Sequence, residues 1–211
     1  MLDYYAVGEL FETEDRQIQS SAREYLESEV KPSASAWWEE GEFPKELVSK
    51  FGEMGFLGAN LSREYGCAGV GNVPYGLIMY ELERIDSGLR SFASVQGALV
   101  MYPISRYGSE EQKRTFLPAM AAGQTVGCFG LTEHDGGSDP GAMKTRARKV
   151  GETYVLNGTK MWITNGNIAD VALIWAKDDD DAVRGFLVPT KSPGFRANKI
   201  ERKMSMRASV T

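Results

Sequence analysis

The stretch GCFGLTEHDGGSDPG, residues 127–141, stands where the chain changes from helical to β-type patterning. Five of its fifteen residues are glycine, and it holds the only histidine of the chain. Glycine lets backbone N–H groups approach a ligand closely, and the hydroxyls of Thr132 and Ser138 can donate or accept hydrogen bonds. The segment could therefore hold a carbonyl, the edge of a flavin ring or a phosphate. The alternative is a connector in which Asp135, Ser138 and Asp139 form turns.

Composition limits the classes of protein to consider. The 211 residues suit one large domain or two small ones, and 42% of them are hydrophobic, which is enough for a core. A net charge of -5 gives no reason to expect nucleic acid or an anionic membrane as a partner. The acidic N-terminal stretch is unlike a signal or transit peptide, which favours a cytoplasmic protein. Cys67 and Cys128 are far apart, so neither a disulfide scaffold nor a metal site is expected.

The segment before residue 125 is predicted to be an all-α domain, residues 1–124. Apolar residues recur at helical spacing from Ile18 onward, and Pro32 is expected to end that first helix. Pro44 is expected at the first position of another helix, where its missing N–H costs nothing. Ser109 and Gln112 form the capping-box pair of a helix that Gly123 ends.

The remainder, residues 125–211, is predicted to be a small antiparallel β-barrel or sandwich, so that the fold class is α+β. Five short segments are rich in β-forming residues: CFGLTE, YVLNGTKMWIT, VALIWAK, RGFLVPT and GFRANKIERK. Asn157-Gly158 predicts a hairpin turn, because both residues tolerate positive φ, and AKDDDDAVRG predicts a second, acidic one. The chain stops at MSMRASVT without a turn or cap, so this domain is expected to be cut short.

Two further stretches are candidates for chemistry. In MWITNG, residues 161–166, Trp162 on a strand would offer its face to a planar ring, with Thr164 on the same side of the strand; a core tryptophan is the alternative. Arg90 lies seven residues after Glu83, and its planar guanidinium is suited to binding a carboxylate of a ligand. The alternative is a surface salt bridge between Glu83 and Arg90, without a ligand. His134 lacks a nucleophile partner and is expected to be solvated. The chain has no P-loop, HExxH or GxSxG motif, and GCAGVGNVPYG is not a dinucleotide fingerprint.

Taken together, CFGLTEHDGGSDPG and LNGTKMWITNG resemble the two flavin segments of the acyl-CoA dehydrogenase family. The resemblance covers the whole chain, and it implies FAD as the cofactor. The positions that match the flavin-lining residues of the family are Phe129, Gly130, Leu131, Thr132, Gly137, Ser138, Trp162, Ile163 and Thr164. Ser138 also matches a residue that contacts the thioester ligand. His134 stands where the family has proline, which is not expected to remove a contact.

Other segments resemble the glutaryl-CoA dehydrogenases of that family, among them ERIDSGLRSFASVQGALVMYPI and KMSMRAS. Arg90 matches the arginine that grips the distal carboxylate of the glutaryl chain, with Ser91 and Glu83 beside it. The resemblance implies conversion of glutaryl-CoA to crotonyl-CoA with loss of CO₂, in lysine and tryptophan degradation. It also implies electron transfer to an electron-transferring flavoprotein and a homotetramer when complete.

The catalytic base of the family is a glutamate in a C-terminal helical domain, and no glutamate here matches it. The resemblance therefore implies that the base lies beyond Thr211 and that these residues hold no catalytic residue of their own. A chain without that domain is expected to bind flavin weakly and to turn over little by itself. Three alternatives stay open: a dehydrogenase for a neutral short-chain or branched acyl-CoA, a non-catalytic flavin-binding module, and an oxidase that passes electrons to O₂.

Overall fold

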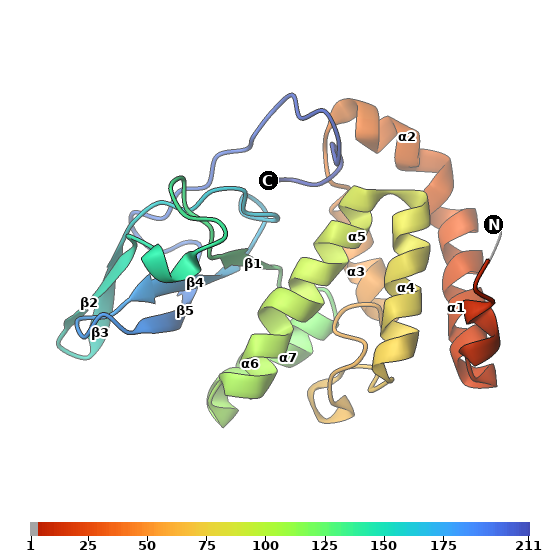
Figure 1. The fold of residues 1–211 in the computed structure, drawn as a ribbon, viewed down its shortest axis with the longest axis horizontal. Helices are drawn as coiled ribbons and strands as arrows, with labels where there is room; N and C mark the ends of the chain where they lie inside the picture. The colour runs from red at the N-terminus through yellow and green to blue at the C-terminus, as the bar shows by residue number, and fades with distance from the viewer. Residues whose placement is uncertain (1–3) are drawn as a thin grey trace.

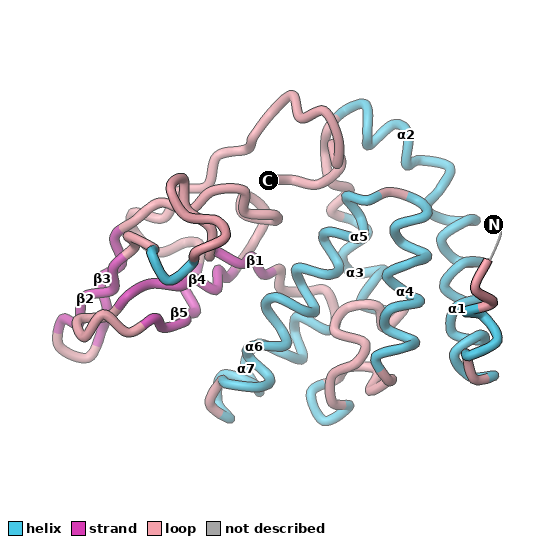
Figure 2. Tube along the Cα trace, viewed as in Figure 1, coloured by secondary structure: helices cyan, strands magenta, loops and turns pink. Residues whose placement is uncertain are grey.

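The computed structural model describes residues 4–211 and consists of a helical part followed by a β-rich part. The helices stand side by side, and the strands form a separate sheet that joins them through β1 (Figure 1). Figure 2 shows that most of the β-rich part is loop and that the last residues return to the helices. Within the described residues, no helix is long and apolar enough to cross a membrane.

The helical part forms a bundle around one buried apolar core. Its α-helices are α1 (Thr13–Tyr25), α2 (Lys31–Glu40), α3 (Glu46–Glu53), α4 (Asn72–Ile85), α5 (Ser87–Ser94), α6 (Tyr102–Tyr107) and α7 (Glu110–Ala121). Two π-helical stretches, Leu26–Val30 and Val95–Met101, join α1 to α2 and α5 to α6. The short 3₁₀ turns are Val7–Leu10, Arg63–Tyr65 and Pro140–Ala142.

The prolines do not stand where the sequence pattern placed them. Pro32 was expected to end the first helix, but the chain continues through the π-helical stretch into α2, and Pro32 lies in the first turn of α2. The extra residue of a π-helical turn rearranges the hydrogen-bond ladder there, so the missing proline N–H is tolerated. Pro44 precedes α3 by two residues, and its carbonyl accepts a hydrogen bond from Leu47 N at 2.9 Å.

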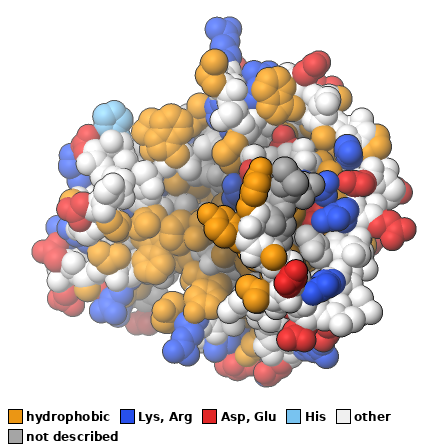
Figure 3. Space-filling view, turned by 45° about the vertical axis from the view of Figure 1, so that its right-hand side comes forward, with side chains coloured by type: hydrophobic (Ala, Val, Ile, Leu, Met, Phe, Trp, Pro, Cys, Tyr) orange, Lys and Arg blue, Asp and Glu red, His pale blue; other side chains and the backbone are white. Residues whose placement is uncertain are grey.

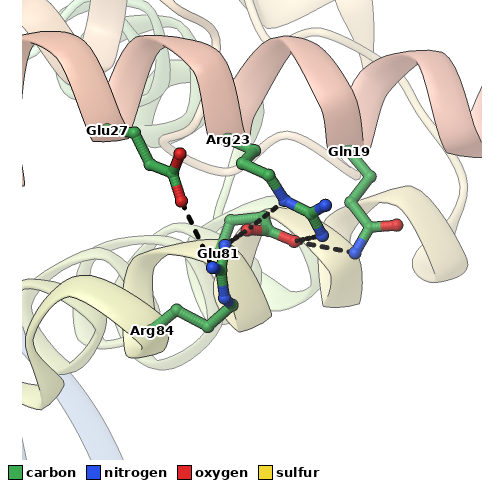
Figure 4. Close-up of polar contacts among 5 residues, drawn as sticks. All are labelled: Gln19, Arg23, Glu27, Glu81 and Arg84. Atoms are coloured by element: carbon green, nitrogen blue, oxygen red, sulfur yellow. Dashed lines mark hydrogen bonds and ion pairs between the residues drawn. The ribbon is translucent and has the colours of Figure 1, made fainter. Parts of the chain in front are cut away.

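A buried carboxylate joins α1 to α4. The Glu81 side chain is 1% exposed and receives hydrogen bonds from Gln19, Arg23 and Arg84, with Arg23 Nη2 at 2.8 Å (Figure 4). Arg84 also pairs with Glu27, in the π-helical stretch Leu26–Val30 that follows α1. Burial alone would raise the pKa of Glu81, but these donors outweigh burial and lower it. The charged Glu81 therefore fixes the position of α4, which carries Glu83.

The β-rich part is one mixed sheet. Its strands are β1 (Gly127–Gly130), β2 (Arg146–Val150), β3 (Thr153–Asn157), β4 (Val171–Lys177) and β5 (Val183–Pro189). β4 pairs with β1 and β2 in parallel and with β5 antiparallel, and β2 pairs antiparallel with β3. The prediction of a wholly antiparallel barrel or sandwich was therefore wrong, because no barrel closes within residues 4–211 and β1 reaches β4 by a long connection.

The predicted hairpin at Asn157-Gly158 is also wrong. β3 pairs with the strand before it, through a turn at Gly151, which has φ +61°. Gly158 has no positive φ, but a side chain there would overlap Thr145. The glycine therefore serves close packing instead of a turn. GFRANKIERK forms no strand, whereas the acidic hairpin is confirmed: Asp178 accepts hydrogen bonds from the N–H groups of Asp180 and Ala182 between β4 and β5.

Hydrogen bonds of a buried glutamine and of an arginine near the end of the chain join the two parts. Gln96 is fully buried, and its side chain donates to Thr125 O at 2.8 Å and accepts from Gly127 N at 2.8 Å. Near the end of the chain, Arg207 donates to the Trp38 and Glu39 carbonyls at 2.8 and 2.7 Å. The guanidinium of Arg207 also lies 5.1 Å from the centre of the Trp38 ring. The β-rich part is thereby held both to the π-helical stretch before α6 and to α2.

Candidate functional site

The two loop segments singled out in the sequence lie side by side. The first follows β1, and the second lies between β3 and β4. Met161 N donates to Thr132 O at 2.8 Å, and the Lys160 ammonium donates to Leu131 O at 3.0 Å. These bonds hold residues 131–132 against residues 160–161, although the two stretches are 29 residues apart in sequence.

Trp162 is not on a strand. Its backbone forms a bend with φ +63°, a region that non-glycine residues rarely adopt. Side chains do not alternate between two faces here, so strand geometry no longer supports the prediction that Trp162 and Thr164 lie on the same face. Trp162 is 57% exposed, which contradicts the alternative of a core tryptophan. Two further bonds anchor the following turn, because buried Asn165 donates to Gly127 O at 3.3 Å and to Val210 O at 2.8 Å.

Three hydroxyls in these segments remain available. Among residues 4–211, the side chains of Thr132, Ser138 and Thr164 have no hydrogen-bond partner. Ser138 is exposed in the loop around the 3₁₀ turn Pro140–Ala142, whereas Thr132 and Thr164 are half-buried. Figure 3 shows that hydrophobic side chains also gather on one face of the molecule, with charged side chains around them. An exposed tryptophan and unpaired hydroxyls in the two paired segments fit a planar ring that has a polar edge.

A buried ion pair joins the two segments. Lys160 Nζ is 2.8 Å from Glu133 Oε1, and the two side chains are 8% and 9% exposed. Glu133 also accepts hydrogen bonds from Lys144 N at 2.7 Å, from Thr145 N at 3.0 Å and from the Thr145 hydroxyl. Burial alone would raise the pKa of Glu133, but Lys160, Thr145 and the two backbone donors lower it to about 2. Both residues are within the quoted motifs, yet the sequence reasoning considered only the hydroxyls and the tryptophan.

Arg90 and its neighbours form a second group, on α4 and α5. Arg90 Nε is 2.7 Å from Glu83 Oε2, and Arg90 Nη1 donates to Ser94 Oγ at 3.2 Å. Ser91 is buried, whereas the Arg90 side chain is 33% exposed and so is only partly removed from water. Burial alone would raise the pKa of Glu83, but Ser87 and Arg90 lower it. Within residues 4–211, the hydrogen bonds of Arg90 stay in this group and do not reach the paired loops.

The second group contains a feature that the sequence did not reveal. The Tyr75 hydroxyl is buried and has no hydrogen-bond partner within residues 4–211. Burial raises the pKa of Tyr75, while the positive charge of Arg90 opposes that rise. A buried phenol without a partner is uncommon. Only packing could have identified it, because Tyr75 occupies an ordinary position in α4.

The other titratable candidates are unremarkable for catalysis. The His134 side chain is 85% exposed and lies 2.8 Å from Asp135, as expected for a solvated loop residue. Cys67 and Cys128 are free and buried, and burial raises their pKa values to about 11 and about 12. These thiols are therefore poor nucleophiles. Within the described residues, no group of three His, Cys, Asp or Glu side chains could hold a metal ion.

Thr211, beyond which the catalytic base is expected, is held by two hydrogen bonds. Its carbonyl accepts from Ile200 N at 2.7 Å, and its hydroxyl accepts from Lys203 Nζ at 3.0 Å. Burial lowers the pKa of Lys203, whose ammonium also donates to Ser209 O. These contacts fix the position of Thr211, and the location of the catalytic base beyond it stays a prediction.

This arrangement of helices, mixed sheet and paired loops is the acyl-CoA dehydrogenase fold. Residues 12–124 match the family description "Acyl-CoA dehydrogenase, N-terminal domain", and residues 128–211 match "Acyl-CoA dehydrogenase, middle domain". The chain belongs to the acyl-CoA dehydrogenase family, as its resemblance to the family implied.

The chain is similar to three proteins of known name or structure. A glutaryl-CoA dehydrogenase from Mycobacterium smegmatis, solved in complex with FADH2, is 54% identical with a TM-score of 0.95 over 99% of this chain and 54% of that one. The human mitochondrial short-chain specific acyl-CoA dehydrogenase is 37% identical over 98% of this chain and 51% of its own length. A chain from a structure of the electron transferring flavoprotein of Acidaminococcus fermentans is 34% identical, with a TM-score of 0.90 over 99% of this chain and 55% of that one. The chain thus spans about half the length of its relatives.

Proposed function

We propose that these residues form the flavin and acyl-chain surfaces of an FAD-dependent acyl-CoA dehydrogenase whose substrate is glutaryl-CoA. The observation that carries the proposal is the pairing of Thr132 with Met161, because it brings both flavin-type segments to one place. Bound FAD would supply the redox chemistry, accepting the β-hydrogen of the thioester as hydride. No residue up to Thr211 is assigned as the base that takes the α-proton.

The residues of the chain have separate roles in this proposal. Trp162 covers the flavin ring, and the hydroxyls of Thr132 and Thr164 donate to its polar edge. Ser138 contacts the thioester end of the ligand. Donors placed where negative charge develops stabilise such a reaction by a few kcal/mol each. The rest of the flavin surface consists of Phe129, Gly130, Leu131, Gly137 and Ile163.

Arg90 supplies the specificity for a dicarboxyl substrate. Its Nε and Nη1 atoms contact Glu83 and Ser94, which leaves Nη2 for a ligand carboxylate. Glu83 and Ser94 hold the guanidinium, with Ser91 next to Arg90 on α5, and charge-assisted hydrogen bonds to the guanidinium would favour glutaryl-CoA over a neutral chain. The similarity to a glutaryl-CoA dehydrogenase at 54% identity supports this choice. Loss of CO₂ to give crotonyl-CoA, an electron-transferring flavoprotein as acceptor and a tetrameric assembly are parts of the same proposal.

A neutral short-chain substrate is the second candidate. The similarity to a short-chain specific enzyme favours it, and so does the existing Glu83 partner of Arg90, because a paired arginine needs no carboxylate from the ligand.

Binding of glutaryl-CoA and butyryl-CoA to the FAD-loaded chain distinguishes the two candidates. We expect glutaryl-CoA to bind more tightly than butyryl-CoA. Arg90→Ala should lower the ratio of the two affinities by about tenfold to a hundredfold, the range of a charge-assisted contact. Arg106→Ala, an exposed arginine of α6, is the matched control and should leave the preference unchanged. Equal affinity for both thioesters, or tighter binding of butyryl-CoA, contradicts the glutaryl assignment.

A further inference from the structure

The Glu133 carboxylate connects three stretches of chain that are distant in sequence. It lies in the first flavin-type segment and receives donors from residues 144–145, just before β2, and from Lys160 in the second segment. Lys160 in turn donates to Leu131 O at 3.0 Å. These contacts join the same two stretches as the Thr132–Met161 hydrogen bond and lie next to it in sequence.

Two glycines lie close to the residues of this ion pair. A side chain at Gly130 would lie 3.4 Å from Lys160 Cγ and would overlap Ile174, so the lysine stem lies against bare backbone. A side chain at Gly158 would overlap Thr145, the residue that donates twice to Glu133. Gly158 therefore permits Thr145 to stand where it donates to Glu133, whereas Gly130 makes room for Ile174.

The burial of both charged side chains bears on the role of this ion pair. Both side chains are more than nine-tenths buried, and a buried pair is a weak source of stability because desolvation offsets the attraction. Replacement of a buried ion pair by nonpolar side chains of similar size is often neutral or stabilising. A role in specifying one arrangement of the two loops accounts for the charges better.

We propose that Glu133 and Lys160 are positioning residues, which set the register of the two flavin-facing segments so that Thr132 and Trp162 meet the same ring. The inference deepens the proposed function and rests on it. Neither residue needs to contact the flavin, because both act through Leu131, Thr132 and Met161.

The test uses the double variant Glu133→Gln with Lys160→Met, which removes both charges and leaves no unpaired buried ion. Its thermal unfolding should stay close to that of the parent. Hydrogen exchange of the Met161 amide in the ligand-free chain should become at least about tenfold faster, and the dissociation constant for FAD should rise at least about tenfold. The control is Arg146→Gln with Asp181→Asn, an exposed ion pair of the same β-rich part, which should change neither quantity.

Each outcome decides a separate question. If Met161 exchange or FAD affinity in the double variant equals that of the parent, the positioning role is wrong. If the parent itself does not bind FAD, the proposed function fails, and Met161 exchange alone then decides whether the ion pair holds the two segments together. Recovery of parental exchange by Glu133→Asp, which keeps the charge, would support the role of the ion pair.

Discussion

Gly158 illustrates at the residue scale how one signal can have two meanings. Asn-Gly is a strong turn signal, yet the structure uses this glycine to let Thr145 approach the backbone. Sequence periodicity reports local conformation and contains no information on which distant side chain will lie against a given residue. The prediction therefore failed at this position while the neighbouring β3 (Thr153–Asn157) was correctly expected.

Gly158→Ala should destabilise the protein by about 1–3 kcal/mol, because the added methyl group overpacks against Thr145. Gly76→Ala, in the exposed face of α4 with nothing within 4 Å of the new methyl group, should be neutral or stabilising by up to about 1 kcal/mol. Urea unfolding of both variants measures the difference. Equal stabilities for the two variants would rule out the packing explanation.

The low pKa of Glu133 predicts a dependence of stability on pH. The pKa falls from 4.5 to about 2 on folding, so the folded state favours the ionised carboxylate. That stabilisation is complete above about pH 4.5 and disappears as the pH falls toward 2. The gap in the free energy of unfolding between the parent and Glu133→Gln should therefore narrow over this range. A gap that stays constant from about pH 6 to about pH 2 would contradict the assignment.

Trp162 and Arg90 mark the limit of residue-level prediction at the candidate site. The resemblance of motifs selected both, and residue types alone supported a ring contact and a carboxylate grip. The left-handed backbone at Trp162 and the partial exposure of Arg90 depend on tertiary contacts. The same is true of the buried partners Glu133 and Lys160.

At the scale of elements, the capping-box signal was reliable, whereas the Asn157-Gly158 turn signal and the expected strand pairing were not. The capping box of α7 is present as Ser109 and Gln112 predicted, because it depends on residues three apart. The parallel pairing of β1 with β4 joins Gly127 to Val171, and no short window of sequence contains that information. The β-rich part was therefore expected as an antiparallel barrel and proved to be a mixed sheet.

Gln96 is the element-level contact that joins the π-helical stretch Val95–Met101 to β1. Gln96→Leu should lower the free energy of unfolding by about 2–4 kcal/mol, because Gly127 N and Thr125 O lose buried partners. Gln124→Leu, at an exposed position, should change it by no more than about 0.5 kcal/mol. Chemical denaturation compares the two, and a cost below about 1 kcal/mol for Gln96→Leu would mean that this connection is unimportant. A polar residue inside the apolar run FASVQGALV was the available sequence signal.

At the scale of the whole molecule, the helical part and the sheet are one structural unit. Gln96 connects them at β1. The end of the chain connects them again, because Arg207 donates to α2 and the Val210 carbonyl accepts a hydrogen bond from Asn165. Asn165 belongs to the second flavin-type segment and also donates to Gly127. The position of that segment thus depends on both parts of the molecule.

The central claim is that the two paired loops form a flavin surface, and FAD titration of the 211-residue chain tests it most directly. We predict saturable binding, followed by flavin absorbance and protein fluorescence, that weakens at least about tenfold in Trp162→Ala. Tyr107→Ala, which removes a 77% exposed aromatic side chain from α6, should bind FAD as the parent does. Absence of saturable binding by the parent, or identical affinities for the parent and Trp162→Ala, would contradict the claim.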